Sequence, residues 1–166
     1  MASTPDGTKW LSSFLSQCQN CTIDFLSAHF YGPPSALQQY LLSLHTTYPA
    51  HPIWLTEFGF PQLSADDTVS LLNETIAFLD GLTWVKRYGY FGGFRKGDGN
   101  GFLGQGGAVW DEEGEITAVG RVWLGLEGTP RTASEASMKN GVGVWGMGVI
   151  ASLVWVLVDG GMVWLC

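Results

Sequence analysis

Three polar residues, His29, Tyr31 and Glu57, stand near the ends of two short runs that read as strands. His29 and Tyr31 close the run 22–31, and Glu57 closes the run 53–58. In parallel α/β barrels the reacting groups lie at the carboxyl ends of strands. A carboxylate there can act as a nucleophile or a general base, and an imidazole or a phenol beside it can orient it or move a proton. These residues are therefore the first candidates for chemistry.

Each candidate has an ordinary structural alternative. Glu57 can cap a loop or pair with Lys86 or Arg87, because an unpaired carboxylate is costly to bury. His29 can be a hydrogen-bonded core histidine, and the tyrosines can be packing residues whose hydroxyls find a partner. The acidic run 111–115 is expected to be a solvated turn. Spacing alone leaves these alternatives open.

Alternating strand and helix patterns are expected to position the candidates. They predict right-handed βαβ units and parallel strands. Simple alternation places Ile53, Leu55 and Glu57 on one face of their strand, and His29 with Tyr31 on one face of theirs. The predicted elements are a helix over 9–17, a strand over 22–31, a helix over 35–48, a strand over 53–58, a helix over 64–79, a strand over 84–91, a Gly-rich loop over 92–107 and a helix over 116–126.

The composition narrows the function classes. The net charge is −7 and the isoelectric point is about 4.7, so a nucleic-acid partner is not expected. Aromatic residues make up 13% of the chain and include eight Trp, which fits either a dense core or a groove that stacks sugar rings. No His pair or second Cys pair lies at metal-ligand spacing, so a zinc site is not expected. Chemistry carried by carboxylates alone implies neither a metal nor an organic cofactor.

Cysteines and glycosylation sequons indicate an oxidising compartment. Cys18 and Cys21 form a C-Q-N-C unit, for which a local disulfide is preferred over free thiols. Asn20 and Asn73 each begin a sequon and are predicted glycosylation sites. The polar stretch 1–10 contains no signal peptide.

The composition changes near residue 128. Residues 1–127 are expected to form the folded domain, 128–141 a polar linker and 142–166 an apolar tail. Small residues, a short spacer and an apolar end form the pattern of a glycolipid-anchor (GPI) signal, which would attach the protein to a membrane. A transmembrane helix and a tail from a non-native reading frame are the alternatives. The segment 142–158 carries no charge, but Asp159 and several glycines make either membrane pattern imperfect.

From Thr8 to about Gly125 the chain resembles the fungal alkali-sensitive-linkage type glycosyl hydrolase catalytic domain, glycoside hydrolase family 128. The combination and order of the matching pieces are specific, although each piece alone is not. The pieces are Phe14–Cys18, Cys21–Phe25, Ala28–Gly32, Pro52–Phe58, Trp84–Tyr88, Phe91–Gly92 and Thr117–Gly120.

The resemblance implies the last three units of a retaining (β/α)8 TIM barrel that acts on cell-wall β-1,3-glucan outside the cell. By this resemblance Glu57 ends strand seven and is the catalytic nucleophile. His29 and Tyr31 end strand six and line the cleft, and Tyr90 and Phe91 end strand eight as an aromatic floor for the sugar. The implied location is secreted, at the cell wall or cell surface.

The partner carboxyl group of such a site is missing from the pattern. Retaining hydrolysis uses two carboxyl groups about 5–5.5 Å apart. The resemblance places the acid/base on an Asn-Glu pair at the end of strand four, before this chain begins, and Asn73-Glu74 is predicted to lie mid-helix instead. We therefore expect a fragment that is inactive or barely active alone. The alternative is a non-catalytic, wall-anchored protein that binds glucan.

Overall fold

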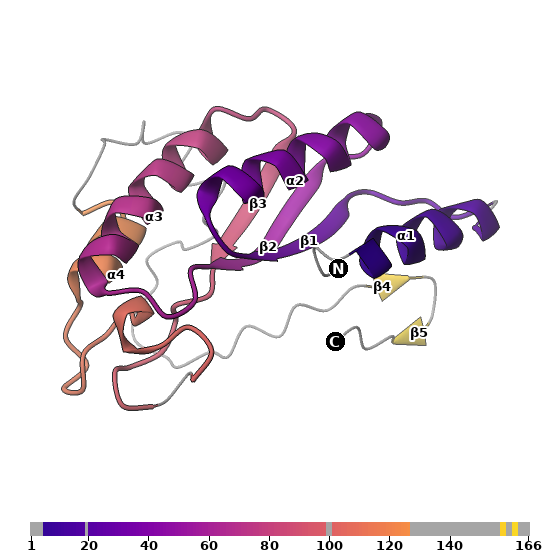
Figure 1. The fold of residues 1–166 in the computed structure, drawn as a ribbon. Helices are drawn as coiled ribbons and strands as arrows, with labels where there is room; N and C mark the ends of the chain where they lie inside the picture. The colour runs from indigo at the N-terminus through magenta and orange to yellow at the C-terminus, as the bar shows by residue number, and fades with distance from the viewer. Residues whose placement is uncertain (1–4, 19, 99–100, 127–156, 159–160, 163–166) are drawn as a thin grey trace.

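The structure, a computed structural model, describes residues 5–18, 20–98, 101–126, 157–158 and 161–162. Its centre is a three-stranded parallel sheet in the order β1-β2-β3, and helices α2 and α3 lie over one face of it (Figure 1). The elements in chain order are α1 (Pro5–Gln17), β1 (Leu26–Tyr31), α2 (Pro34–Thr47), β2 (Ile53–Gly59), α3 (Ala65–Asp80), β3 (Val85–Tyr90), the short 3₁₀ helix η1 (Gln105–Gly107), α4 (Ala118–Trp123), β4 (Leu157–Val158) and β5 (Gly161–Met162).

The predicted order of helices and strands in residues 5–126 is confirmed, and so is the parallel pairing. The bounds differ in places: α1 begins at Pro5, and α4 is shorter than predicted. The first strand begins at Leu26 instead of Thr22. It is shorter because Leu26 pairs with Ile53, the first residue of β2, so the ladder starts there.

Local capping fixes where the helices begin after the strand-end loops. The Ser64 hydroxyl accepts a hydrogen bond from the Asp67 backbone N–H at 3.1 Å, and acidic residues in the first turn of α3 favour the positive end of its dipole. Pro34 opens α2, where its missing N–H costs nothing. Thr117 caps α4 by accepting from the Gly120 N–H at 3.1 Å.

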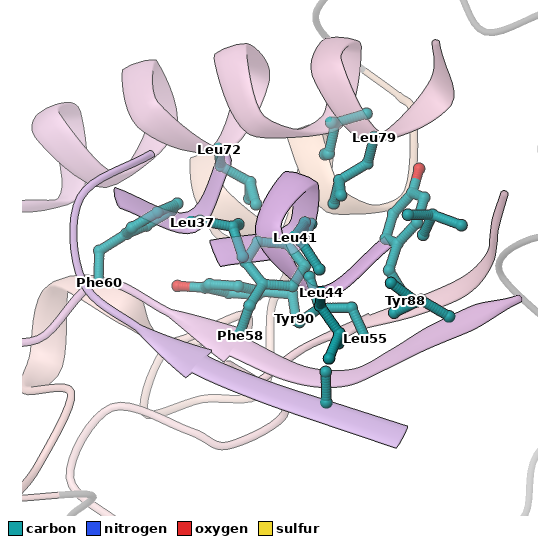
Figure 2. Close-up of a cluster of buried hydrophobic side chains, with 14 of the residues drawn as sticks. Leu37, Leu41, Leu44, Leu55, Phe58, Phe60, Leu72, Leu79, Tyr88 and Tyr90 are labelled. Atoms are coloured by element: carbon teal, nitrogen blue, oxygen red, sulfur yellow. The ribbon is translucent and has the colours of Figure 1, made fainter. Parts of the chain in front are cut away.

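The hydrophobic core fills the space between the sheet and its helices (Figure 2). Leu37, Leu41 and Leu44 recur at helical spacing, which brings all three to the sheet-facing side of α2. The labelled core side chains are Leu37, Leu41, Leu44, Leu55, Phe58, Phe60, Leu72, Leu79, Tyr88 and Tyr90.

A β-bulge in β2 decides which side chains share a face. Ala28 pairs with Leu55 but His29 pairs with Glu57, so Thr56 is an extra residue in β2. Leu55 is fully buried in the core, whereas Glu57 is partly exposed and bonds to side chains of β1 outside that core. The expectation that Glu57 shares a face with Leu55 is therefore wrong, because simple alternation assumes an unbroken ladder.

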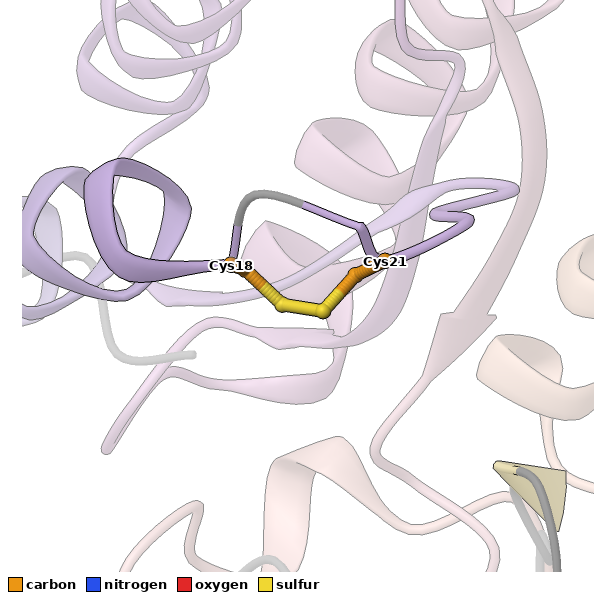
Figure 3. The surroundings of a disulfide bond; sticks show 2 residues. All are labelled: Cys18 and Cys21. Atoms are coloured by element: carbon orange, nitrogen blue, oxygen red, sulfur yellow. A yellow bond between two sulfur atoms is a disulfide. The ribbon is translucent and has the colours of Figure 1, made fainter.

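A disulfide joins Cys18 to Cys21 just after α1 ends (Figure 3). The two Cα atoms lie 5.4 Å apart, within the range that a disulfide spans. This is the local pairing that the sequence favours. It ties the end of α1 to the segment that leads into β1.

The expected linker and apolar tail lie largely outside the described residues. Of the segment from residue 127 onward, the structure describes β4 and β5, which pair antiparallel through Leu157–Met162 and Val158–Gly161. No described helix has both the length and the apolar character that a membrane crossing needs. The anchor-signal interpretation and its alternatives stay predictions.

Two neighbouring leucines of α2 test the core directly. Leu41 is fully buried, and Leu42 is 49% exposed. We expect Leu41→Ala to lower the free energy of unfolding by about 2–5 kcal/mol, because it leaves a cavity between α2 and the sheet. Leu42→Ala should change it by less than about 0.5 kcal/mol. Urea unfolding of both variants measures the difference, and equal losses would contradict this packing.

Candidate active site

Glu57 lies near the carboxyl end of β2, on the face of the sheet opposite α2 and α3, which we call the site face. The Tyr31 hydroxyl donates a hydrogen bond to Glu57 Oε2 at 2.5 Å. His29 Nδ1 lies 3.4 Å from the same oxygen. The carboxylate is thus held by two side chains of the neighbouring strand, and the structure brings together the three residues singled out in the sequence.

The alternative pairing of Glu57 with a basic residue of β3 is not what the structure shows. The Arg87 guanidinium lies 4.8 Å from the centre of the Trp54 ring, and Lys86 is exposed. Among the described residues, the polar contacts of the carboxylate are those with Tyr31 and His29, both on Oε2. Its other oxygen, Oε1, accepts a hydrogen bond from neither residue.

The surroundings set the protonation states of the two partners. Burial raises the pKa of Tyr31, and the hydrogen bond to Glu57 acts in the same direction, so the phenol stays protonated and donates. Burial lowers the pKa of His29, while the negative charge of Glu57 opposes that shift. The imidazole is therefore mostly neutral at pH 7. The side chains of Glu57 and His29 are 37% and 32% exposed, so a ligand can reach them.

Two aromatic rings lie against Tyr31. The Phe91 ring meets it edge to face with centroids 5.7 Å apart, and the Phe102 ring does so at 4.9 Å. Phe91 was expected near the site, and its placement here agrees with that. The sequence does not single out Phe102, although a large apolar residue in a Gly-rich polar loop can indicate a binding residue.

Tyr90 lies elsewhere. It shares a face of β3 with Tyr88, and that face packs against the helices, where Tyr90 is 8% exposed. Its hydroxyl donates to the Gly107 carbonyl at 3.0 Å. The expectation that Tyr90 and Phe91 together form an aromatic floor is therefore wrong for Tyr90, which packs in the core, whereas Phe91 contacts Tyr31.

A second residue missed in the sequence, Gln62, fixes the loop that carries Phe102. Its side-chain Nε2 donates to the carbonyls of Gly101 and Phe102 at 2.6 and 2.9 Å, and its backbone N–H donates to the Leu103 carbonyl at 2.9 Å. Gln62 has a φ of 60°, a left-handed conformation that is uncommon outside glycine. The connection after β2 therefore clamps the loop after β3.

The two predicted glycosylation residues differ in their surroundings. Asn20 lies on an exposed turn after α1. Asn73 lies in the middle of α3, where its amide donates to the Val69 carbonyl at 3.2 Å, and Thr75 of the same sequon is buried. Modification of either residue stays a prediction. Among the described residues, no group of three or more His, Cys, Asp or Glu could hold a metal ion.

The sequence matches known proteins over most of residues 1–126. The family described as "Glycosyl hydrolase catalytic core" matches residues 1–123. Alkali-sensitive linkage protein 1 of Schizosaccharomyces pombe is 38% identical over 126 residues, which cover 71% of this chain and 23% of that protein.

The fold matches solved structures of glycoside hydrolase family 128. An exo-β-1,3-glucanase from Aureobasidium namibiae is 26% identical, with a TM-score of 0.65 over 74% of this chain and 49% of that one. An endo-β-1,3-glucanase from Lentinula edodes is 24% identical, with a TM-score of 0.66 over 73% and 53%. An oligosaccharide-binding protein from Trichoderma gamsii is 21% identical, with a TM-score of 0.59 over 69% and 45%.

The chain therefore spans about half the length of these solved structures and 23% of the yeast relative. Within that span the family match covers the sheet, its helices and the Glu57 site. This chain belongs to the glycosyl hydrolase catalytic core family, that of the family 128 glycoside hydrolases.

Proposed function

We propose that this chain carries the nucleophile part of a retaining β-1,3-glucan hydrolase. The observation that carries the proposal is the Glu57 carboxylate at the end of β2, held through Oε2 by Tyr31 and His29. A carboxylate fixed by one oxygen presents the other in a defined direction. In the proposed reaction Oε1 attacks the anomeric carbon of a glucosyl residue bound on the site face.

The proposal places the three parallel strands in a larger barrel. A (β/α)8 barrel takes about 250 residues, and the chain spans about half of the family 128 structures it matches. In this arrangement β1, β2 and β3 are the last three barrel strands. Their site face is the barrel interior, and the carboxyl ends that carry Tyr31 and Glu57 open to the substrate.

Retaining hydrolysis needs a second carboxyl group that protonates the leaving oxygen. Among the described residues, the polar groups that contact Glu57 are a phenol and an imidazole. Because the chain spans about half of the family 128 structures it matches, the acid/base is proposed to come from outside the described residues. General acid catalysis contributes about 10²–10⁴-fold, so this chain alone should hydrolyse native glucan slowly or not at all.

A second candidate function is glucan binding without hydrolysis. The observation in its favour is that Tyr31 and His29, the polar partners of Glu57, are a phenol and an imidazole, which can bind a sugar hydroxyl without cleaving a glycosidic bond. One matched structure is described as that of an oligosaccharide-binding protein. Both candidates share β-1,3-glucan as the ligand and differ only in bond cleavage.

With either candidate function we propose a location outside the cell, at a wall that contains glucan. The Cys18–Cys21 disulfide supports it, because disulfides persist in oxidising compartments. Attachment to a membrane through the tail is a separate proposal that rests on the sequence pattern alone.

An activated substrate separates the two candidates. A 2,4-dinitrophenyl β-glycoside of a β-1,3-linked glucose disaccharide has a leaving group that departs as the phenolate and needs no acid catalyst. We expect one equivalent of dinitrophenolate per protein to be released in a burst, as the C–O bond to Glu57 forms and the bond to the phenolate breaks. Stopped-flow absorbance measures the burst.

Matched carboxylate variants control this measurement. Glu57→Gln should abolish the burst, and Glu113→Gln, which changes an exposed acid of the turn before α4, should retain it. A wild-type chain that binds the glycoside without a burst would favour the binding function. If the chain hydrolyses linear β-1,3-glucan at a rate within about tenfold of an intact family enzyme, the proposal that it lacks the acid/base is wrong. That group contributes at least about 10²-fold to the rate.

The charge coupling between Glu57 and His29 gives a further prediction. The negative charge of Glu57 raises the pKa of His29 against the effect of burial. Glu57→Gln should therefore lower the pH at which the His29 imidazole titrates, and Asp66→Asn, which removes an exposed charge in α3, should not. NMR titration of the imidazole C–H signals measures both. A rise in the midpoint with Glu57→Gln would be inconsistent with this contact.

A further inference from the structure

Phe102 is an exposed aromatic ring in the loop that follows β3. It is 52% exposed, and the next residue, Leu103, is the fully buried side chain that anchors the loop. A Cβ atom on Gly59 would lie 2.9 Å from the Leu103 side chain, so β2 and the loop are in close contact there. Leu103 anchors the loop in the core, while the Phe102 ring beside it is exposed enough for a ligand to reach it.

The ring also contacts the residue that binds the Glu57 carboxylate. Phe102 meets Tyr31 edge to face at 4.9 Å, and the Tyr31 hydroxyl binds Glu57 Oε2. Phe91, which is 37% exposed, meets the same tyrosine at 5.7 Å. Both exposed rings therefore contact Tyr31, the residue that binds Glu57. A sugar chain with its scissile bond at Glu57 can extend toward them.

The chemistry of β-linked glucose matches this surface. Its hydroxyl groups are equatorial, so both faces of each pyranose ring present axial C–H groups and are apolar. Flat aromatic rings in binding sites complement such faces, and a few polar groups fix the orientation. Here the polar groups are Glu57, His29 and Tyr31.

Gln62 holds this ring at a conformational cost. Two of its hydrogen bonds end on the carbonyls of Gly101 and Phe102, and its own backbone is left-handed. Uncommon backbone conformations persist where surrounding contacts enforce them, and they concentrate at functional sites. The amide thus acts on the position of Phe102 from the far side of the loop.

We propose that Phe102 is a sugar-stacking residue of this site and that Gln62 is the residue that positions it. The proposal rests on the proposed function, because it takes β-1,3-glucan as the ligand. It adds a contact for a glucosyl unit next to the one at Glu57, and it assigns specificity for a flat, all-equatorial sugar to the loop after β3.

Calorimetric titration of the full chain with a β-1,3-linked glucose hexasaccharide tests the stacking role. We expect Phe102→Ala to weaken binding about tenfold, in line with the loss of one aromatic contact. Phe102→Trp should stay within about threefold of the wild type, because it keeps a flat ring. Phe102→Leu, which keeps apolar bulk without the flat face, should be nearly as weak as Phe102→Ala. Leu42→Ala, an exposed apolar change on α2, should leave binding unchanged.

A double-mutant cycle tests the positioning role. Gln62→Gly removes the side-chain amide, and glycine still allows the left-handed backbone at this position. The connection after β2 therefore keeps its backbone conformation. We expect it to weaken binding as much as Phe102→Ala does, to remove the NMR contact between the Phe102 and Tyr31 rings, and to add nothing in the double variant. A full additional loss in the double variant would overturn the positioning role.

The remaining outcomes separate this inference from the proposed function. If the wild type binds the hexasaccharide and either Phe102→Ala or Phe102→Leu binds it with the same affinity, the stacking role is overturned and the proposed function stands. A wild-type chain that does not bind the hexasaccharide would overturn both.

Discussion

The bulge at Thr56 is the constraint on which the site depends. An unbroken β2 would carry Glu57 into the core with Leu55, where burying a carboxylate is costly. The extra residue turns the carboxylate to the site face, opposite His29 of β1. The neighbouring strand accommodates this distortion at Gly89, where a Cβ atom would lie 2.9 Å from the Thr56 carbonyl oxygen.

Polar contacts on the site face then follow from the register. The hydroxyls of Ser27 and Thr56 lie 2.9 Å apart across β1 and β2, just before the Glu57 contacts. Tyr31 and His29 reach the same carboxylate oxygen from one strand. The side chains between the sheet and its helices are mostly apolar, whereas Ser27, His29, Tyr31, Thr56 and Glu57 make polar contacts on the site face.

Hydrogen bonds and ring contacts join the segments that follow the three strands. Gln62, after β2, binds the backbone around Phe102, and Phe102 in turn contacts Tyr31 at the end of β1. Three strand ends are thus linked through side chains and backbone carbonyls. A surface held in place by such contacts loses less entropy when it binds a ligand.

The sequence by itself determined the order of elements, the parallel sheet and the candidates His29, Tyr31 and Glu57. Apolar periodicity, Pro and Gly stops and helix caps act locally, and they are readable from neighbouring residues. Only the tertiary structure decided the face of Glu57, the burial of Tyr90 and the contacts of Phe102 and Gln62. The bulge arises from pairing between strands about 28 residues apart, and the Gln62 clamp joins residues about 40 apart. No local pattern encodes such pairings, because they exist only once the strands are side by side.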